Sequence, residues 1–320
     1  MDAFSHAATQ MLILFVIVAF GFLARKLKLM NDGFDSMLSK LVMNITLPAM
    51  ILNSVLSNTD LPGTDQIFTM LGLSVVVFGI SCVVAWLFVK LVYRGVSSAA
   101  QGVHMFVIAF GNTGFIGFAV IEALLGPDSV LYGAIFNIPF NLFLFSVGVL
   151  FISSTGTNGP GQKQSLRTKV RMIAKQLVSP CLISCLIAML LAIFHITDSG
   201  FVGSTCKLLG QMTVPAAMLV TGSTIAKSPL KDMVNDGWSY VTTAMRLLVV
   251  SLALFFLLRL FDVDPYLLSI VTILAAMPAA TVGTMFCIAY GGDTKAMART
   301  TFLTTVLSII TIPLVALVVM

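Results

Sequence analysis

Long apolar runs separated by short polar stretches dominate the chain. Ten runs can be counted, at about residues 9–25, 36–56, 66–93, 100–125, 129–152, 172–194, 201–226, 238–260, 266–290 and 297–319. Their lengths are close to or above the roughly 20 apolar residues that a helix needs to cross the hydrocarbon core of a bilayer. The pattern predicts an all-α polytopic membrane protein with ten transmembrane helices.

The composition agrees with this pattern and argues against a soluble globular domain. Hydrophobic residues make up 58% of the 320 residues, charged residues make up 10%, and the mean hydropathy is +1.03. A soluble domain carries roughly 25% charged residues. The five cysteines lie in apolar runs without metal-ligand spacing, so we interpret them as small apolar helix residues and expect no metal or cofactor.

Basic residues are distributed unevenly over the connections between the runs. Fifteen of the 18 are expected on one side: Arg25, Lys26, Lys28, Lys40, Lys90, Arg94, Lys163, Arg167, Lys169, Arg171, Lys175, Lys227, Lys231, Lys295 and Arg299. Lys207 and Arg259 fall on the other side, and Arg246 lies within a run. Because cytoplasmic connections carry the excess of Lys and Arg, we expect a multi-pass protein of the cell (plasma) membrane with both termini outside and a cytoplasmic central loop. The net charge of +5 then reflects topology and lipid contacts, and no nucleic-acid partner is expected.

The second half of the chain repeats the first. A polar linker at 153–167 separates a first five-helix repeat at 1–152 from a second at 168–320. The hexapeptide Asn44-Ile45-Thr46-Leu47-Pro48-Ala49 matches Gln211-Met212-Thr213-Val214-Pro215-Ala216 at an offset of 167, which also superposes the five pairs of runs. Because five is odd, the two halves must insert with opposite orientations. Such an inverted-topology repeat is common in secondary transporters.

The fourth run carries helix-breaking residues at its centre, Gly111-Asn112-Thr113-Gly114. Gly costs a helix about 1 kcal/mol relative to Ala, and Asn and Thr side chains compete for backbone hydrogen bonds. Broken backbone at membrane depth is tolerated only where protein or a water-filled cavity satisfies it. The motif therefore predicts an interrupted helix and a candidate binding site.

The ninth run has a corresponding break at 276–280, where Pro278 lacks an amide hydrogen. The offset of 167 places the first break on the second, with Gly111 and Asn112 on Pro278 and Ala279, and Gly114 and Gly117 on Thr281 and Thr284. Each break presents one half-helix N-terminus, whose free amides and partial positive charge favour an anion. The alternative is a pair of kinked helices packed through small residues.

Other polar residues within the runs are candidates for the same site: Asn44 and Gln211 near the matched Pro48 and Pro215, Asn137 and Asn141 on one helix face, and Arg246. The amides either line a substrate path or join helices by hydrogen bonds. The arginine either attracts an anion or caps a helix C-terminus. Glu122, the only glutamate, is either a proton-coupling group or an interfacial, solvated carboxylate. The three histidines are dispersed and no HExxH or GxSxG motif occurs, so we expect no enzymatic activity.

These motifs resemble the auxin efflux carrier family, and a bacterial malate or malonate permease-like member is a nearer likeness than the plant PIN-FORMED carriers. The likeness covers essentially the whole chain and is carried by residues 44–49, 110–117 and 277–280, with Arg246-Leu247 as a weaker match. It departs from the family where Phe118-Ala119 stand in place of a frequent proline, and in its short central loop. It implies a fold like the bile acid/sodium symporters, with two broken crossing helices. Helices 1, 2, 6 and 7 would form a scaffold, helices 3–5 and 8–10 would form a mobile transport domain, and Asn112 would contact a substrate carboxylate.

We therefore expect a secondary transporter that moves a small organic anion by elevator-type alternating access. The expected substrate is a mono- or dicarboxylate, such as malate or an auxin-like acid, held by the residues of the two breaks. The alternatives are a sodium- or proton-coupled symporter of amphipathic anions, and a membrane receptor or scaffold without transport. The expected partners are the anion and the lipid bilayer, with a homodimer among the options for assembly.

Overall fold

The computed structural model describes residues 2–57, 61, 63–155, 180–198, 200–227 and 233–319. Most of the predicted linker and the start of the sixth apolar run lie outside these residues, together with the basic residues of the central loop and Lys231. The described regular structure is helical, apart from one isolated β-bridge.

The first half of the chain contains α1 (Asp2–Lys26), α2 (Asp32–Leu41), η1 (Val42–Thr46), α3 (Leu47–Leu56), α4 (Thr64–Val92), α5 (Ser98–Ala109), η2 (Thr113–Gly117), α6 (Phe118–Leu125), α7 (Ser129–Phe143), η3 (Leu144–Gly148) and α8 (Val149–Thr155). The second half contains α10 (Pro180–Ile193), α11 (Phe201–Gly210), α12 (Thr213–Lys227), α14 (Gly237–Ala244), η4 (Met245–Val249), α15 (Val250–Leu258), η5 (Arg259–Phe261), α16 (Pro265–Ala275), α17 (Gly283–Tyr290) and α18 (Thr294–Val319). The turns η1 to η4 are π-helical and η5 is a 3₁₀ turn.

Six of the described helical stretches are long and apolar enough to cross a membrane: Asp32–Leu56, Thr64–Val92, Ser129–Ser153, Phe201–Lys227, Gly237–Phe261 and Thr294–Val319. Four shorter apolar helices accompany them: Ser98–Ala109, Thr113–Leu125, Pro180–Ile193 and Pro265–Ala275. Spans of this length keep the backbone hydrogen-bonded within the helix where no water is present. The protein is therefore an all-helical, polytopic membrane protein.

Several helices begin at side-chain caps that the sequence encodes directly. Asn31 accepts a hydrogen bond from the Phe34 amide at the start of α2, and Asp264 accepts bonds from two amides at the start of α16. Ser97 caps α5 in the same way. Because the first amides of a helix have no partner within the helix, these oxygens fix where each helix begins.

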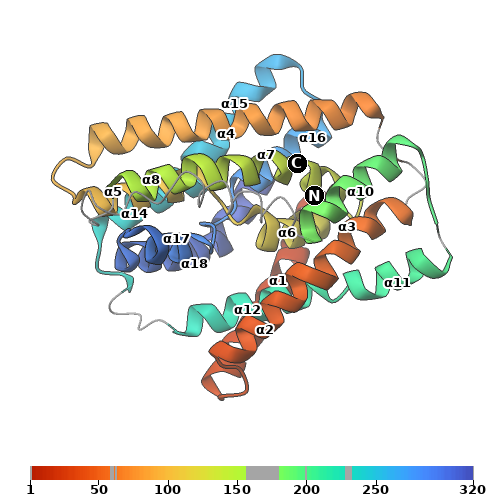
Figure 1. Ribbon diagram of the computed structural model, residues 1–320, viewed down its shortest axis with the longest axis horizontal. Helices are drawn as coiled ribbons and strands as arrows, with labels where there is room; N and C mark the ends of the chain where they lie inside the picture. Colours follow the sequence, from red (N-terminus) through yellow and green to blue (C-terminus); the bar gives the residue numbers. More distant parts are fainter. Residues whose placement is uncertain are drawn as a thin grey trace.

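The helices pack in two groups. In the first, α1 runs along α12, and α3 packs against α10 and α11. In the second, α4 contacts α5 and α7, α5 contacts α8, and α18 contacts α14 and α17. Figure 1 shows α4 across the upper part of the view, below the top of α15, and α11 and α12 in the lower part. The groups meet where α1 contacts α6 and α18, and where α7 contacts α3 and α10.

Charged side chains join three helix ends within the first group. Asp35 of α2, whose side chain is 5% exposed, lies 3.3 Å from Arg25 Nη1 and 3.1 Å from Lys227 Nζ. It also accepts a hydrogen bond of 2.7 Å from Ser223 of α12. Asp32 pairs with the same two basic residues but is largely exposed. The buried carboxylate thus ties the ends of α1 and α12 to the start of α2.

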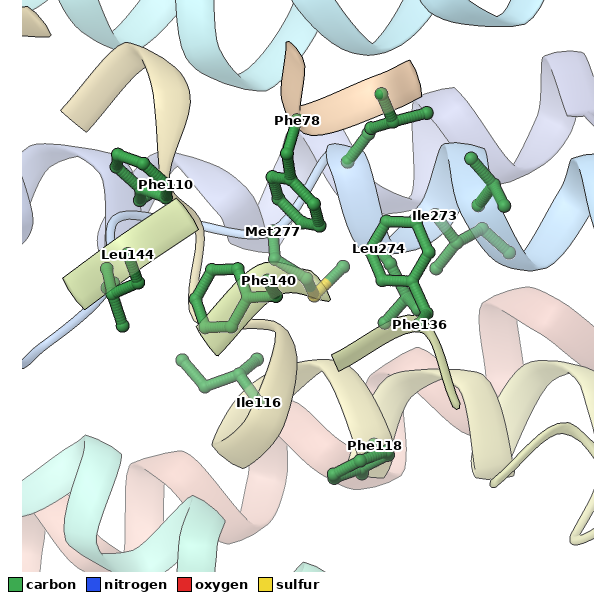
Figure 2. Packing of buried hydrophobic residues seen from close by; sticks show 14 of the residues in the cluster. Phe78, Phe110, Ile116, Phe118, Phe136, Phe140, Leu144, Ile273, Leu274 and Met277 are labelled. Atoms are coloured by element: carbon green, nitrogen blue, oxygen red, sulfur yellow. The ribbon is translucent and has the colours of Figure 1, made fainter. Parts of the chain in front are cut away.

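An aromatic cluster fills the interior of the second group. The ring of Phe78 in α4 lies 5.0 Å from Phe136, 5.2 Å from Phe140 and 6.5 Å from Phe110, measured between centroids. Figure 2 shows these rings beside Met277. The apolar packing surrounds the interruption between α5 and η2, and so places that backbone in a medium of low polarity.

Candidate functional site

The fourth and ninth apolar runs are interrupted at the positions that the sequence indicates. Helix α5 ends at Ala109, Phe110 has extended backbone angles (φ −119°, ψ 113°), and helical structure resumes at Thr113. Helix α16 ends at Ala275, and α17 begins at Gly283. Both interrupted segments carry backbone groups that need partners from outside their own helices.

The two interruptions satisfy one another. The Asn112 amide donates to the Pro278 carbonyl at 2.7 Å, and the Ala280 amide donates to the Phe110 carbonyl at 3.1 Å. Gly111 and Ala279 thereby form an isolated antiparallel β-bridge. The bridge joins the two halves of the chain at one point, which we call the helix crossing. It also uses two of the amides that the sequence suggested would be free.

Asn112 caps the half-helix that leads away from the crossing. Its Oδ1 accepts from the Phe115 amide at 3.1 Å, and its carbonyl accepts from the Gly117 amide at 2.9 Å. Its Nδ2 is buried and has no hydrogen-bond partner among the described residues. The backbone amides of Thr113 and Gly114 donate no hydrogen bond within the described residues. A methyl group at Gly114 would meet no neighbouring part of the protein within 4 Å. Open space therefore adjoins Gly114, whereas the unused donor of the Asn112 side chain is enclosed by protein.

Arg246 reaches the crossing from η4 and is 1% exposed. Its Nε donates to the Met277 carbonyl at 3.0 Å, and its Nη1 donates to the carbonyls of Ile108 at 3.2 Å and Ala109 at 3.4 Å. The guanidinium therefore caps the C-terminal end of α5 and holds the second break against it, where the helix dipole favours a cation. Its Nη2 is buried without a hydrogen-bond partner in the described residues and lies against Gly111.

Each break is also tied to the long helix that follows it in the sequence. Thr113 donates to Asn137 Oδ1 of α7 at 2.6 Å, and the Ala279 amide donates to Thr304 Oγ1 of α18 at 3.2 Å. Asn141, the other candidate on α7, donates to the Asn137 carbonyl at 2.7 Å. Asn137 was among the residues predicted from the sequence, whereas Thr304 was not. The offset of 167 that relates the two breaks also carries Asn137 onto Thr304, and would have identified it.

The other candidates lie away from the bridge. Glu122 and Gln211 line one cavity of about 300 Å³ between α3, α11 and the end of α6, together with Lys207, Asp128, Asn53, Ser54 and Ser57. Asn44 is exposed and donates to the Lys40 carbonyl of its own helix. Thr281 is exposed and Thr284 is half-buried beside the second break. A separate apolar cavity of about 30 Å³ lies between η2, α1, α12 and α18.

Comparison with known proteins shows the family to which the chain belongs. A family model described as membrane transport protein matches residues 6–316. The chain belongs to this family, the auxin efflux carrier family of membrane transport proteins. The resemblance found in the sequence is thereby confirmed.

Similar members of the family come from archaea and bacteria. An uncharacterized transporter of Methanothermobacter thermautotrophicus is 22% identical over 97% of this chain and 98% of its own length. An uncharacterized transporter of Methanocaldococcus jannaschii is 24% identical over 95% of this chain and 96% of its own. The uncharacterized transporter YfdV of Escherichia coli is 23% identical over 86% and 85% of the two chains. These likenesses extend over nearly the whole polypeptide and support a role in transport.

Within this membrane transport protein, the crossing combines three features that bear on ligand chemistry. It brings the two breaks into direct contact, it buries a guanidinium without an acidic partner among the described residues, and it leaves donors unused. Among the described residues no group of histidine, cysteine or acidic side chains has the arrangement of a metal site. The chemistry available at the crossing is hydrogen-bond donation and positive charge.

Proposed function

We propose that this protein is a secondary transporter of a small organic anion, and that the anion binds at the helix crossing. The observation that carries the proposal is the pair of buried donors without acceptors, Asn112 Nδ2 and Arg246 Nη2. A buried donor left unpaired costs about 1–3 kcal/mol. A carboxylate offers two oxygens with several acceptor sites, so an anionic guest would recover this cost.

The carboxylate is expected on the side of the crossing where the amides of Thr113 and Gly114 are unused. The amide end of η2 and α6 carries partial positive charge, which favours an anion. Arg246 adds a formal charge nearby, and this charge is weakly screened because the side chain is only 1% exposed. We propose Thr281, which is exposed next to the second break, as a further hydroxyl for a second carboxylate or polar tail.

The proposed architecture is ten spans arranged as two inverted five-helix repeats. In support, the breaks fall at corresponding positions of the two halves, as in transporters built from such repeats. We propose that the group formed by α1–α3 and α10–α12 is the scaffold, and that the group formed by α4–α8 and α14–α18 is the mobile transport domain. The proposed topology has both termini outside the plasma membrane, with a homodimer as the proposed assembly.

Alternating access would come from sliding of the mobile domain against the scaffold. The cavity beside Ile116 and Val120, where η2 and α6 meet α1 and α12, measures about 30 Å³. That volume holds only about one or two water molecules. We propose that relative movement of the two helix groups widens this space and lets a carboxylate reach or leave the crossing.

Counterflow in proteoliposomes tests the proposal. Proteoliposomes that contain the wild-type protein and are loaded with unlabelled L-malate, malonate or indole-3-acetate should exchange at least one of these acids for its labelled form. Asn112→Ala should abolish the exchange while the protein still inserts and elutes as a single species. The matched control is Asn235→Ala, at an exposed asparagine before α14, and it should exchange like wild type. Normal exchange by Asn112→Ala would refute the assignment, and specific binding without exchange would favour a receptor.

Proton coupling is a second candidate, favoured over sodium coupling by the place of Glu122. This carboxyl group lines the larger cavity, where Asp128 and Lys207 are the other charged groups. Sodium would want several oxygen ligands, commonly with carboxylates, and no metal-type cluster occurs in the described residues. A pH gradient, but not a sodium gradient, should then drive accumulation of the exchanged acid. Accumulation that follows sodium alone would contradict this.

A further inference from the structure

We infer that Asn137 and Thr304 are a matched pair of positioning residues, one from each half of the chain, that together hold Asn112 in place for ligand binding. The role in ligand binding rests on the proposed function, whereas the positioning of Asn112 by these two residues does not. Neither residue is offered as a ligand-binding group. Each acts through the backbone of the break that it supports.

The side chains of Asn137 and Thr304 both accept one hydrogen bond and donate another within the protein. Asn137 accepts from Thr113 at 2.6 Å and donates through Nδ2 to the Gly133 carbonyl at 2.9 Å. Thr304 accepts from the Ala279 amide at 3.2 Å and gives its single hydroxyl hydrogen to the Thr300 carbonyl at 2.9 Å. Both residues are buried. Side chains held by a bond on each side, as these are, orient the groups that they contact.

The contacts made by Asn137 and Thr304 lie on either side of Asn112. Thr113 follows Asn112 directly in the chain, and Ala279 follows Pro278, whose carbonyl accepts from the Asn112 amide at 2.7 Å. One contact therefore fixes Asn112 through its own strand of the β-bridge, and the other fixes it through the opposite strand. The loss of either should loosen the same residue.

The internal repeat relates Asn137 to Thr304. The offset of 167 that aligns the two breaks also aligns Asn137 with Thr304, although the residues differ in type and contact different atoms. One engages the side chain of Thr113, and the other engages the main chain of Ala279. Two helices from opposite halves thus use the same position for the same purpose. A purely local packing role would not require this coincidence.

The structural part of the inference can be tested without any substrate. Hydrogen–deuterium exchange would be measured in nanodiscs for wild type, Asn137→Ala, Thr304→Val, and Thr113→Val, which breaks the first contact from its other end. Each variant should speed exchange about fivefold to tenfold at the amides of both Asn112 and Ala280, because the bridge joins them. Thr304→Ser keeps the hydroxyl and should behave like wild type. The control Asn141→Ala removes a bond within α7 only and should leave both breaks unchanged.

The functional part is read from the kinetics of L-malate counterflow, or of whichever acid of the panel wild type exchanges. Each of the three disruptive variants should raise KM about tenfold or more and lower turnover at saturating substrate less, since a displaced binding group weakens binding first. A faster exchange confined to the break nearest the substitution, or no change at either break, would overturn the inference. If wild type exchanges no acid while the deuterium result holds, the proposed function fails and the positioning pair stands. An unchanged KM with loosened breaks would overturn the link to Asn112.

Discussion

Gly111→Ala tests whether the guanidinium of Arg246 holds the two breaks together. A methyl group at this position would overlap Nη2 of Arg246, and would lie 2.9 Å from its Cζ and 3.0 Å from the Met277 carbonyl oxygen. No small rotation relieves all three contacts, because one of them involves backbone. The guanidinium must therefore move away from the carbonyls that it caps.

The cost follows from the bonds that the guanidinium makes. Displacement breaks the two shorter bonds, to Met277 at 3.0 Å and Ile108 at 3.2 Å, and the longer one to Ala109. Hydrogen bonds to charged groups contribute about 1.5–3 kcal/mol each, so the two shorter bonds together represent about 3–6 kcal/mol. The matched control is Gly114→Ala, where the added methyl group meets open space. This substitution also replaces a glycine within a helix by a better helix former. Its stability should equal or exceed that of wild type.

The assay is thermal unfolding in detergent, followed by a double-mutant cycle. Gly111→Ala should unfold at a clearly lower temperature than Gly114→Ala. In an Arg246→Ala background the same methyl should cost much less, since the group that it displaces is gone. Equal destabilisation by Gly111→Ala in both backgrounds would refute the reasoning, because the clash with the guanidinium would then not be its cause.

Three further predictions concern groups away from the bridge. Asp35→Asn should destabilise the protein by about 2–3 kcal/mol in chemical unfolding, because it removes a buried charge that pairs with Arg25 and Lys227. Asp32→Asn should destabilise the protein clearly less, because that carboxylate is exposed, and equal effects would contradict the burial argument. Thr242→Val should lower the free energy of unfolding by about 1–3 kcal/mol, because Thr242 Oγ1 joins the Tyr93 hydroxyl at 2.6 Å to His104 Nδ1 at 2.7 Å. The control Thr205→Val loses only an exposed bond to its own helix and should unfold like wild type. A larger loss of stability in Thr205→Val than in Thr242→Val would refute the role of this network. Glu122→Gln should abolish accumulation driven by a pH gradient and preserve counterflow, and retained gradient-driven accumulation would exclude Glu122 as the proton-coupling group.

The interruptions could be predicted from the sequence because their causes are local. Gly111, Asn112 and Pro278 are residue types that disfavour the interior of a helix, and the offset of 167 relates the two positions within the sequence. The same reasoning could not foresee that the breaks would bond to each other through Asn112 and Ala280. That pairing depends on how α5 and α16 approach in space, and it changes which amides remain for a ligand.

Arg246 and Asp35 show where sequence reasoning stops. For Arg246 two roles stayed open, and only the distances to the carbonyls of Ile108 and Met277 show that it caps the crossing. Asp35 gave no signal, since its partner Lys227 lies far away in the sequence and charges near helix ends are ordinary. The π-helical turns were likewise not expected, because an extra residue leaves little trace in a run that is apolar nearly throughout.

The central claim is that an organic anion sits at the helix crossing, and solid-state NMR tests it most directly. Protein with ¹⁵N-labelled asparagine would be prepared with L-malate labelled with ¹³C at its carboxylates, or with the acid that wild type exchanges. Dipolar dephasing between a carboxylate carbon and a side-chain nitrogen at about 4 Å, the separation expected across an N–H···O hydrogen bond, should appear in wild type and vanish in Asn112→Ala. Dephasing that persists in that variant, or bound acid that shows none in wild type, would contradict the account.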